Sequence, residues 1–129
     1  MPERFADIPT VTAKLLEQVV GTGRAGITTP SSLTGLLPFA RVTRSGGPRD
    51  RLSDYARIDV DVLDNNYLRG LRAAEDISAL LERGRLRYGG VVLDRVDVDS
   101  GPQEVVPWAP GIFRFEMRFT IVSRRFRAV

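Results

Sequence analysis

The chain has 129 residues, 43% of them hydrophobic, with 8 prolines and 12 glycines, which is typical of one domain with many turns. It lacks cysteine and histidine, which excludes disulfides, thiolate chemistry and the most common general base. The formal charge is only +3, from 19 basic and 16 acidic residues spread along the chain, which excludes a continuous basic stripe for tight phosphate binding.

A first helix is predicted over residues 9–20, where apolar residues recur at three- and four-residue spacing. Asp7 or Thr10 can cap its start, and Gly21 ends it. The residues of its apolar face are Ile8, Val11, Leu15 and Val19. Residues 21–35 hold Gly, Pro, Ser and Thr too densely for a regular element, so we expect a long loop or an extended arm there.

Two strands are predicted next, Leu36–Arg44 and Tyr55–Leu63, and the turn-forming residues 45–50 join them into a hairpin. The second strand alternates apolar and charged residues, a pattern typical of a sheet with one buried and one solvent-facing side. The alternating residues are Ile58, Val60 and Val62 on one side and Arg57, Asp59 and Asp61 on the other.

A second helix is predicted between a cap at Asn65 or Asn66 and an end at Gly84. Its apolar stripe consists of Tyr67, Leu71, Ala74, Ile77 and Leu81. Gly70 lies inside this helix, where a glycine costs about 1 kcal/mol relative to alanine. We therefore expect the helix to approach the sheet closely at Gly70.

A third strand is predicted over Val91–Asp99, followed by a turn at 100–102, and the last strand is predicted over Ile112–Val122. The last strand alternates strictly, and its apolar side holds Phe113, Phe115, Met117, Phe119 and Ile121. The element order α-β-β-α-β-β predicts an α+β fold, with an antiparallel or mixed sheet of about four strands packed against two helices.

Residues Gly21–Gly26 match the glycine spacing of a dinucleotide-binding loop. That chemistry needs a strand before the loop and a helix after it, so that amide groups point at the pyrophosphate. Here a predicted helix precedes the loop and Pro30 follows it. We therefore expect a helix cap and a loop rather than a cofactor site.

Two pairs of aspartates each place their carboxylates on one side of a predicted strand, about 7 Å apart. They are Asp59 with Asp61 and Asp97 with Asp99. Such pairs can share a cation or divide acid and base roles, or they can pair with Arg114 and Arg118 of the last strand. We expect cross-strand ion pairs, and the sequence predicts no catalytic residue, no metal ligand and no cofactor.

Trp108 lies between Pro107 and Pro110, which hold the chain extended, and it can either cover the core or anchor a partner. We expect a position over the core. The arginines of the hairpin and of the C-terminal tail are either solvated charges or contacts to other subunits or to passing DNA. The predicted interface residues are Arg44, Arg49, Asp50, Arg51, Trp108, Arg124 and Arg125.

Three segments occur in a distinctive order along the chain. They are Arg44-Ser-Gly-Gly47 followed by Asp50 and Asp54, Arg57–Val62 leading into the helix with Ala73 and Ala74, and Phe113–Val122 ending in Ser123-Arg124-Arg125. In this order, and over nearly the whole chain, the sequence resembles the tail terminator (tail-completion) proteins of long-tailed bacteriophages.

The resemblance implies one tail-terminator-like domain over 1–129, a structural protein of the virion that is assembled in the host cytoplasm. It implies a homo-oligomeric ring, a hexamer, that caps the tail tube protein and stops its polymerisation. The ring offers a docking surface to the head-tail connector protein, and DNA passes through its lumen. Loop 21–35 and hairpin 45–53 are expected to carry the docking contacts.

Other functions fit the same sequence. A head-tail connector or stopper subunit is also a small ring-former. A small nucleic-acid-binding module, from a different class, is supported by the arginine content and weakened by the lack of aromatic residues beside those arginines. A metalloenzyme built on the paired aspartates is third. The start MPERFADIP has no basic, apolar signal pattern and no segment approaches 18 apolar residues, so we expect a soluble protein without membrane contact.

Overall fold

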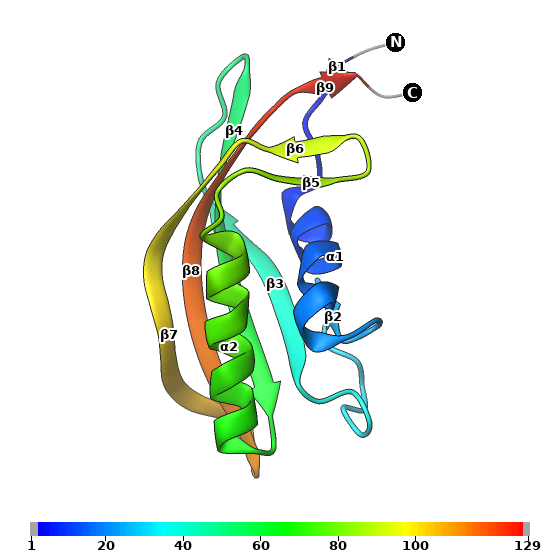
Figure 1. Cartoon of the computed structure of the whole chain (residues 1–129), viewed down its shortest axis with the longest axis vertical. Helices are drawn as coiled ribbons and strands as arrows, with labels where there is room; N and C mark the ends of the chain where they lie inside the picture. Colours follow the sequence, from blue (N-terminus) through cyan, green and yellow to red (C-terminus); the bar gives the residue numbers. More distant parts are fainter. Residues whose placement is uncertain (1–2, 128–129) are drawn as a thin grey trace.

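A five-stranded sheet forms one layer of the structure, and two helices form the other (Figure 1). The computed structural model describes residues 3–127. In spatial order the strands are β2 (Ala25–Gly26), β3 (Phe39–Gly46), β4 (Ser53–Asp64), β8 (Ile112–Arg124) and β7 (Arg95–Ala109). Neighbouring strands run antiparallel except β2 and β3, which are parallel. The predicted α+β fold with a mixed sheet is confirmed, with five strands instead of about four.

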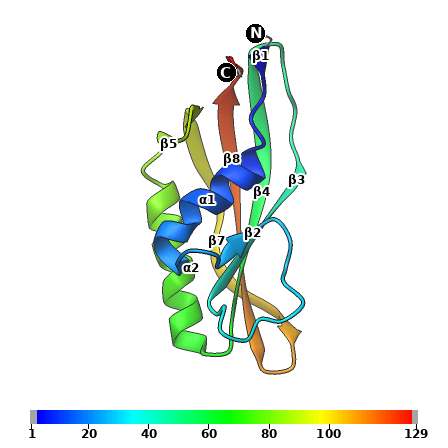
Figure 2. The same cartoon turned by 90° about the vertical axis from the view of Figure 1, so that its right-hand side faces the viewer.

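Both helices begin at side chains that cap their free amide groups. The helices are α1 (Ile8–Val20) and α2 (Tyr67–Leu81). The carboxylate of Asp7 accepts hydrogen bonds from the amide of Thr10 at 3.5 Å and from its hydroxyl at 2.9 Å. The side chain of Asn66 accepts one from the amide of Arg69 at 3.0 Å. The two helices cover the same face of the sheet (Figure 2), and neither is long and apolar enough to cross a membrane.

The core lies between the helices and the inner face of the sheet. The register of β4 and β8 pairs Val60 with Met117 and Val62 with Phe115, and these four residues are fully buried. The predicted apolar side of the last strand is therefore confirmed as a core face, with only Phe113 partly buried. The largest helix contributions to this core come from Ile8, Leu16, Ile77 and Leu81.

Gly70 is a point of close approach between α2 and the sheet. A Cβ atom added there would lie 2.9 Å from the Cβ of Asp64 and 2.9 Å from Cε2 of Phe115. A side chain at this position would force the helix away from β8, because a packed interior has no space to absorb it. The expected close contact at Gly70 is confirmed, and this packing offsets the poor helix propensity of glycine.

The predicted third strand, Val91–Asp99, is divided between two strands, and the turn predicted after it is wrong. The short strands β5 (Leu86–Tyr88) and β6 (Val91–Leu93) pair with each other outside the main sheet. Strand β7 starts only at Arg95 and continues through residues 100–102, where the sequence predicts a turn. The register with β8 shifts between Val98 and Ser100 and again between Ser100 and Gln103. The Ser-Gly-Pro residues are thus accommodated as bulges within a continuing strand.

The loop at 21–35 is tied to the sheet and is not a free arm. Its residues include β2, which pairs with β3, and the guanidinium of Arg24 donates a hydrogen bond to the carbonyl of Leu37 at 2.9 Å. Strand β3 starts at Phe39, later than predicted. Pro38 immediately precedes it and has no N–H to donate to a strand ladder.

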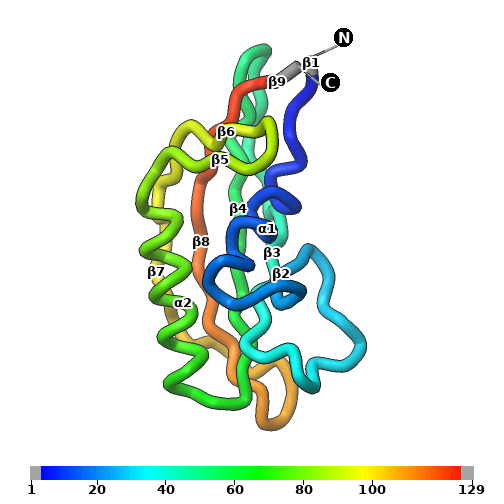
Figure 3. Tube along the Cα trace, turned by 45° about the vertical axis from the view of Figure 1, so that its right-hand side comes forward, coloured from blue at the N-terminus to red at the C-terminus, as the bar shows by residue number. Residues whose placement is uncertain are grey.

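The two ends of the sheet are built from different segments (Figures 1 and 3). The upper end comprises the tip of the β3–β4 hairpin at 47–52, the β5–β6 hairpin and the pair of β1 (Glu3–Arg4) with β9 (Phe126–Arg127). The lower end comprises the β7–β8 turn at 110–111, the loop at 27–38 and the start of α2. Residues distant in the sequence therefore meet at each end.

Candidate functional site

A buried carboxylate holds the β3–β4 hairpin together at the upper end. Asp54 is fully buried, and the guanidinium of Arg44 donates to both of its oxygens at 2.7 Å. Arg49 places its Nε 3.1 Å from the same carboxylate. Burial by itself would raise the pKa of Asp54, but hydrogen bonds and attraction from Arg44 and Arg49 outweigh it and lower that pKa. The pair is therefore a permanent structural contact at neutral pH.

The ring of Phe5 connects this hairpin to segments near both ends of the chain. The guanidinium of Arg49 lies 4.9 Å from the ring centroid, and that of Arg125 lies 4.8 Å from it. The amide of Arg125 also donates to the carbonyl of Leu52 at 3.0 Å. Both guanidinium groups are attracted to the π-electrons of the ring. This attraction joins the segment around Phe5, the β3–β4 hairpin and the segment around Arg125.

Replacing Phe5 with leucine is expected to lower the free energy of unfolding by about 1 to 2 kcal/mol, from two cation–π contacts of about 0.5 to 1 kcal/mol each. Leucine keeps most of the apolar volume but has no ring for Arg49 and Arg125. Urea denaturation measures the change, and Phe5→Tyr, which keeps the ring, is the matched control. If the leucine and tyrosine variants unfold at the same urea concentration, the two arginines do not depend on the ring.

The remaining predicted interface residues of the upper end are a turn carboxylate, a surface pair and an exposed arginine. Asp50 accepts hydrogen bonds from two amide groups of the turn at 2.8 and 2.7 Å, which lower its pKa. Arg124 pairs with Asp94 at 3.2 Å. Arg51 is exposed at the hairpin tip. The structure thus brings every predicted interface residue except Trp108 together at the upper end.

Charged side chains on the outer face of the sheet pair across β4 and β8. Arg114 lies 3.2 Å from Asp61 and 3.2 Å from Glu116. Arg118 lies 3.5 Å from Asp59 and 3.8 Å from Glu116. The predicted cross-strand pairing of Asp59 and Asp61 is therefore confirmed. These five residues, which we call the outer-face ladder, alternate in charge along the sheet.

The second pair of aspartates has other partners than the predicted arginines of the last strand. Asp97 pairs with Arg95 of its own strand at 3.2 Å. Asp99 accepts a hydrogen bond from the hydroxyl of Thr120 at 2.6 Å. Asp97 is paired in register with Thr120, and the bulge after Val98 places Ser100 instead of Asp99 opposite Arg118, so neither carboxylate joins the outer-face ladder.

Burial raises the pKa of both aspartates of the outer-face ladder. Asp61 is 5% exposed, and attraction to Arg114 and Arg41 reverses only part of the effect of desolvation on its pKa. For Asp59, burial again dominates and Arg118 opposes it. One oxygen of each carboxylate approaches its arginine without the alignment of a hydrogen bond. The ion pairs therefore compensate incompletely for burial of the charge.

Lowering the pH from 7 toward 4 is expected to raise the contribution of these aspartates to stability. When the pKa of a carboxyl is raised by folding, the folded state takes up the proton at a higher pH than the unfolded state does. The free energy of unfolding therefore increases as the pH falls through the folded pKa. The gain is complete below about pH 3.9, the unfolded value. Urea midpoints across this range test it, with Asp61→Asn expected to show a smaller rise. Identical pH profiles of the wild type and the variant would contradict the raised pKa of Asp61.

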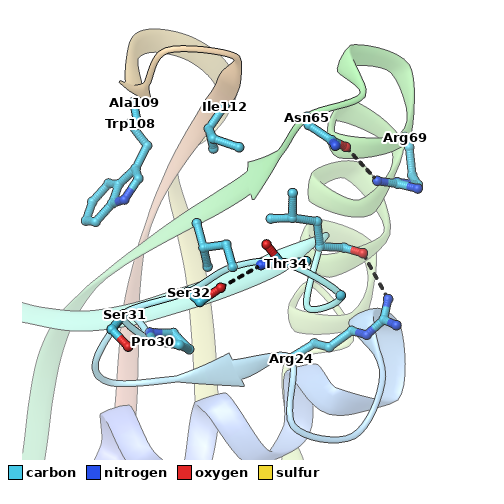
Figure 4. Close-up of a pocket in the computed structure, with 13 residues that line it drawn as sticks. Arg24, Pro30, Ser31, Ser32, Thr34, Asn65, Arg69, Trp108, Ala109 and Ile112 are labelled. Carbon is cyan, nitrogen blue, oxygen red and sulfur yellow. Dashed lines mark hydrogen bonds between the residues drawn. The ribbon is translucent and has the colours of Figure 1, made fainter.

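An open groove of about 760 Å³ lies at the lower end (Figure 4). The loop at 27–38, the start of α2 and the β7–β8 turn surround it. Arg24 and Arg69 line it, and no acidic side chain does so among the described residues. Arg69 is bound to the buried carboxylate of Asp64 at 2.6 and 2.8 Å, whereas Arg24 donates a hydrogen bond to the backbone carbonyl of Leu37. Within residues 3–127, the groove thus offers one arginine without a carboxylate partner.

Trp108 lines this groove and does not cover the core, so its predicted core position is wrong. The residue is 36% exposed, and the guanidinium of Arg41 lies 5.4 Å from its ring centroid. Arg41 is paired in register with Asp61 of the outer face. A further register shift between Val105 and Ala109 accompanies the placement of Trp108 beside this outer-face arginine.

The glycine-rich pattern Gly21–Gly26 does not have the surroundings of a dinucleotide site. Helix α1 precedes it, and it leads into β2 and a loop instead of a helix. Within residues 3–127, no three carboxylates are grouped so that they could hold a metal ion. The chemistry of the surface therefore lies in its arginines, its carboxylates and its exposed apolar side chains.

No family model matches the chain, and no curated protein matches it. Two helices on a mixed sheet serve many functions, so the fold alone assigns none. Two features bear on function. They are the chemical difference between the two ends of the sheet and the side chains along its two edge strands, β2 and β7.

Proposed function

We propose that the chain is the tail terminator of a long-tailed bacteriophage. Six copies form a ring that caps the tail tube, stops its polymerisation and receives the head-side connector, and DNA passes through the lumen. A subunit of this kind needs two different end surfaces, because one must bind the end of the tube and the other must not bind further tube protein. The observation that carries the proposal is the chemical difference between the two ends of the sheet.

The upper end is polar and internally paired. Arg44, Arg49 and Arg124 are bound to Asp54 or Asp94, and Arg49 and Arg125 stack on Phe5, so these residues form a fixed network. Arg51 and Leu52 project at the hairpin tip, and Leu52 is 67% exposed. A rigid polar surface with one projecting tip suits docking against a preformed partner, because little ordering is needed on binding.

The lower end is richer in exposed apolar side chains. They are Tyr67, Leu68, Val106 and Trp108, compared with Leu52 and Tyr88 at the upper end. Exposed aliphatic and aromatic residues beside a groove are typical of protein interaction surfaces. The two ends thus differ in the way that a subunit between a tube and a connector requires.

The proposal predicts a closed ring in solution or on tubes. Light scattering on the purified chain should give about six times the 14.3 kDa mass of one copy, and negative-stain images should show rings. A monomer that stays indifferent to tail tubes would contradict the proposal. Rings that bind the connector but ignore tube ends would favour a connector or stopper subunit instead.

One observation favours a small nucleic-acid-binding module as a second candidate. Trp108 is exposed beside Arg41, and an aromatic ring next to an arginine can stack an unpaired base. Retention on heparin and on DNA columns at moderate salt tests this candidate. Strong retention that falls steeply with salt and is lost in Trp108→Ala would support it and contradict the terminator proposal.

A further inference from the structure

The edge strand β7 exposes an acidic surface. Asp97, Asp99 and Glu104 are exposed along it, and β7 is the last strand in the sheet order. Its one basic residue, Arg95, is 3.2 Å from Asp97, so these two charges balance. Within the described chain no arginine or lysine lies within 4.0 Å of Asp99 or Glu104. Among the described residues, this edge therefore carries two carboxylates without a cationic partner, although Asp99 accepts a hydrogen bond from the hydroxyl of Thr120.

The opposite edge, formed by β2 and the loop around it, is basic. Residues 21–46 contain Arg24, Arg41 and Arg44 but no acidic residue. Arg44 is balanced by Asp54. No carboxylate of residues 4–125 lies within 4.0 Å of Arg24 or Arg41. Arg41 stacks on Trp108 at the outer face, so Arg24 is the basic residue that this edge offers, and the two edges of the sheet are opposite in charge.

Both edges also expose apolar side chains. Val98 is 38% exposed and pairs with Phe119, so it lies on the inner side of β7, whereas Asp97 and Asp99 lie on the outer side with Thr120. Ile27, directly after β2, is 46% exposed. Apolar contacts and complementary charges are both typical of a specific interface.

Strand β7 is unsuited to extending the sheet with another strand. Pro102 and Pro107 have no N–H to donate, and bulges interrupt the register of β7. The charged side chains along the edge oppose edge-to-edge pairing as well. A partner at this edge is therefore held by side chains rather than by a strand ladder.

We propose that the β7 edge of each copy packs against the β2 edge of the next copy in the ring. Asp99 and Glu104 face Arg24, and Val98 faces Ile27. This contact rests on the proposed function, because it supplies the ring that a terminator requires. The two surfaces differ and lie at opposite edges of the sheet, so the contact is heterologous and closes by repeated rotation.

Two charge-reversal variants test the contact. Asp99→Arg with Glu104→Arg makes both edges basic, and Arg24→Glu with Thr28→Glu makes both edges acidic. Each variant alone is expected to run as the 14.3 kDa monomer where the wild type forms rings. An equimolar mixture is expected to regain the ring mass, because every edge then meets its opposite. Glu75→Arg with Asp76→Arg, on the exposed face of α2, is the matched control and should keep the ring.

The outcomes separate this contact from the proposed function. Folded variants that keep the ring mass alone, or that stay monomeric when mixed, overturn the edge contact and leave the terminator proposal intact. A wild type that forms no ring, even with tail tubes, contradicts the terminator proposal itself. If circular dichroism shows that a reversal variant is unfolded, Asp99→Asn with Glu104→Gln and, separately, Arg24→Gln replace it. They should weaken assembly about tenfold, and unchanged assembly overturns the contact.

Discussion

Replacing Gly47 with alanine is expected to lower the free energy of unfolding by more than about 3 kcal/mol. Gly47 has a φ of +107°, which side-chain-bearing residues rarely adopt, and a Cβ there would overlap the carbonyl oxygen of Tyr55. The hairpin tip must move to relieve this overlap. Arg44 donates to the carbonyl of Gly47 at 3.2 Å, so the movement also disturbs its contact with Asp54.

Thermal unfolding measures this effect. For a chain of this length, a loss of 3 kcal/mol corresponds to a fall in Tm of about 10 °C. Gly101→Ala is the matched control, because its backbone is not left-handed and a Cβ there meets no atom within 4 Å. The control should melt within about 2 °C of the wild type. Equal Tm values for Gly47→Ala and Gly101→Ala would contradict the hairpin geometry.

Replacing Asp54 with asparagine is expected to lower the free energy of unfolding by about 3 kcal/mol, as for other broken buried ion pairs. The amide carries no charge, and its NH₂ group cannot accept a hydrogen bond from Arg44 or Arg49. Asp54 is fully buried, so water cannot take over the lost contacts. The β3–β4 hairpin would then lose its central contact.

The pH dependence of the free energy of unfolding shows whether Asp54→Asn acts by removing the ion pair or by changing the shape of the side chain. Because the folded pKa of Asp54 is lowered, its stabilisation is present above about pH 3.9 and is lost as the pH falls through the folded pKa. The difference between wild type and Asp54→Asn in urea unfolding should be large at pH 7 and smaller at pH 3. Asp97→Asn, in an exposed pair, should cost less than about 1 kcal/mol. Equal costs of the two substitutions at pH 7 would contradict the role of Asp54.

Local chemistry in the sequence predicted the helix starts and the core face of the long strands. Asp7 and Asn66 cap helices with their own side chains, which requires only neighbouring residues. The strict alternation of Phe115, Met117 and Phe119 determines which side of β8 is buried, because side chains alternate between the two sides of a strand. Gly70 also carried its own signal, since glycine inside a helix usually has a packing reason.

The bulges of β7 and the contacts of distant residues could not be predicted in this way. Ser-Gly-Pro is compatible with a turn and with a bulge, and only the pairing with β8 decides between them. The wrong position predicted for Trp108 follows from the same bulged strand. Phe5, Arg49 and Arg125 are far apart in the sequence, so no local pattern indicates that two arginines share one ring.

The two ends and the two edges of the sheet have separate roles in the proposed ring. The ends meet the tube and the connector, whereas the edges meet neighbouring copies. Reversing edge charges should therefore remove the ring, whereas Arg51→Ala and Leu52→Ala at the hairpin tip should leave ring mass unchanged and weaken docking alone.

The most direct measurement is the growth of tail tubes with and without the chain. The tail tube protein of the same phage is polymerised, the purified chain is added, and negative-stain images record tube lengths and ends. The terminator proposal predicts that tubes stop growing on addition and carry a ring at one end only. Continued growth with bare ends, under conditions where the chain is folded, would contradict it.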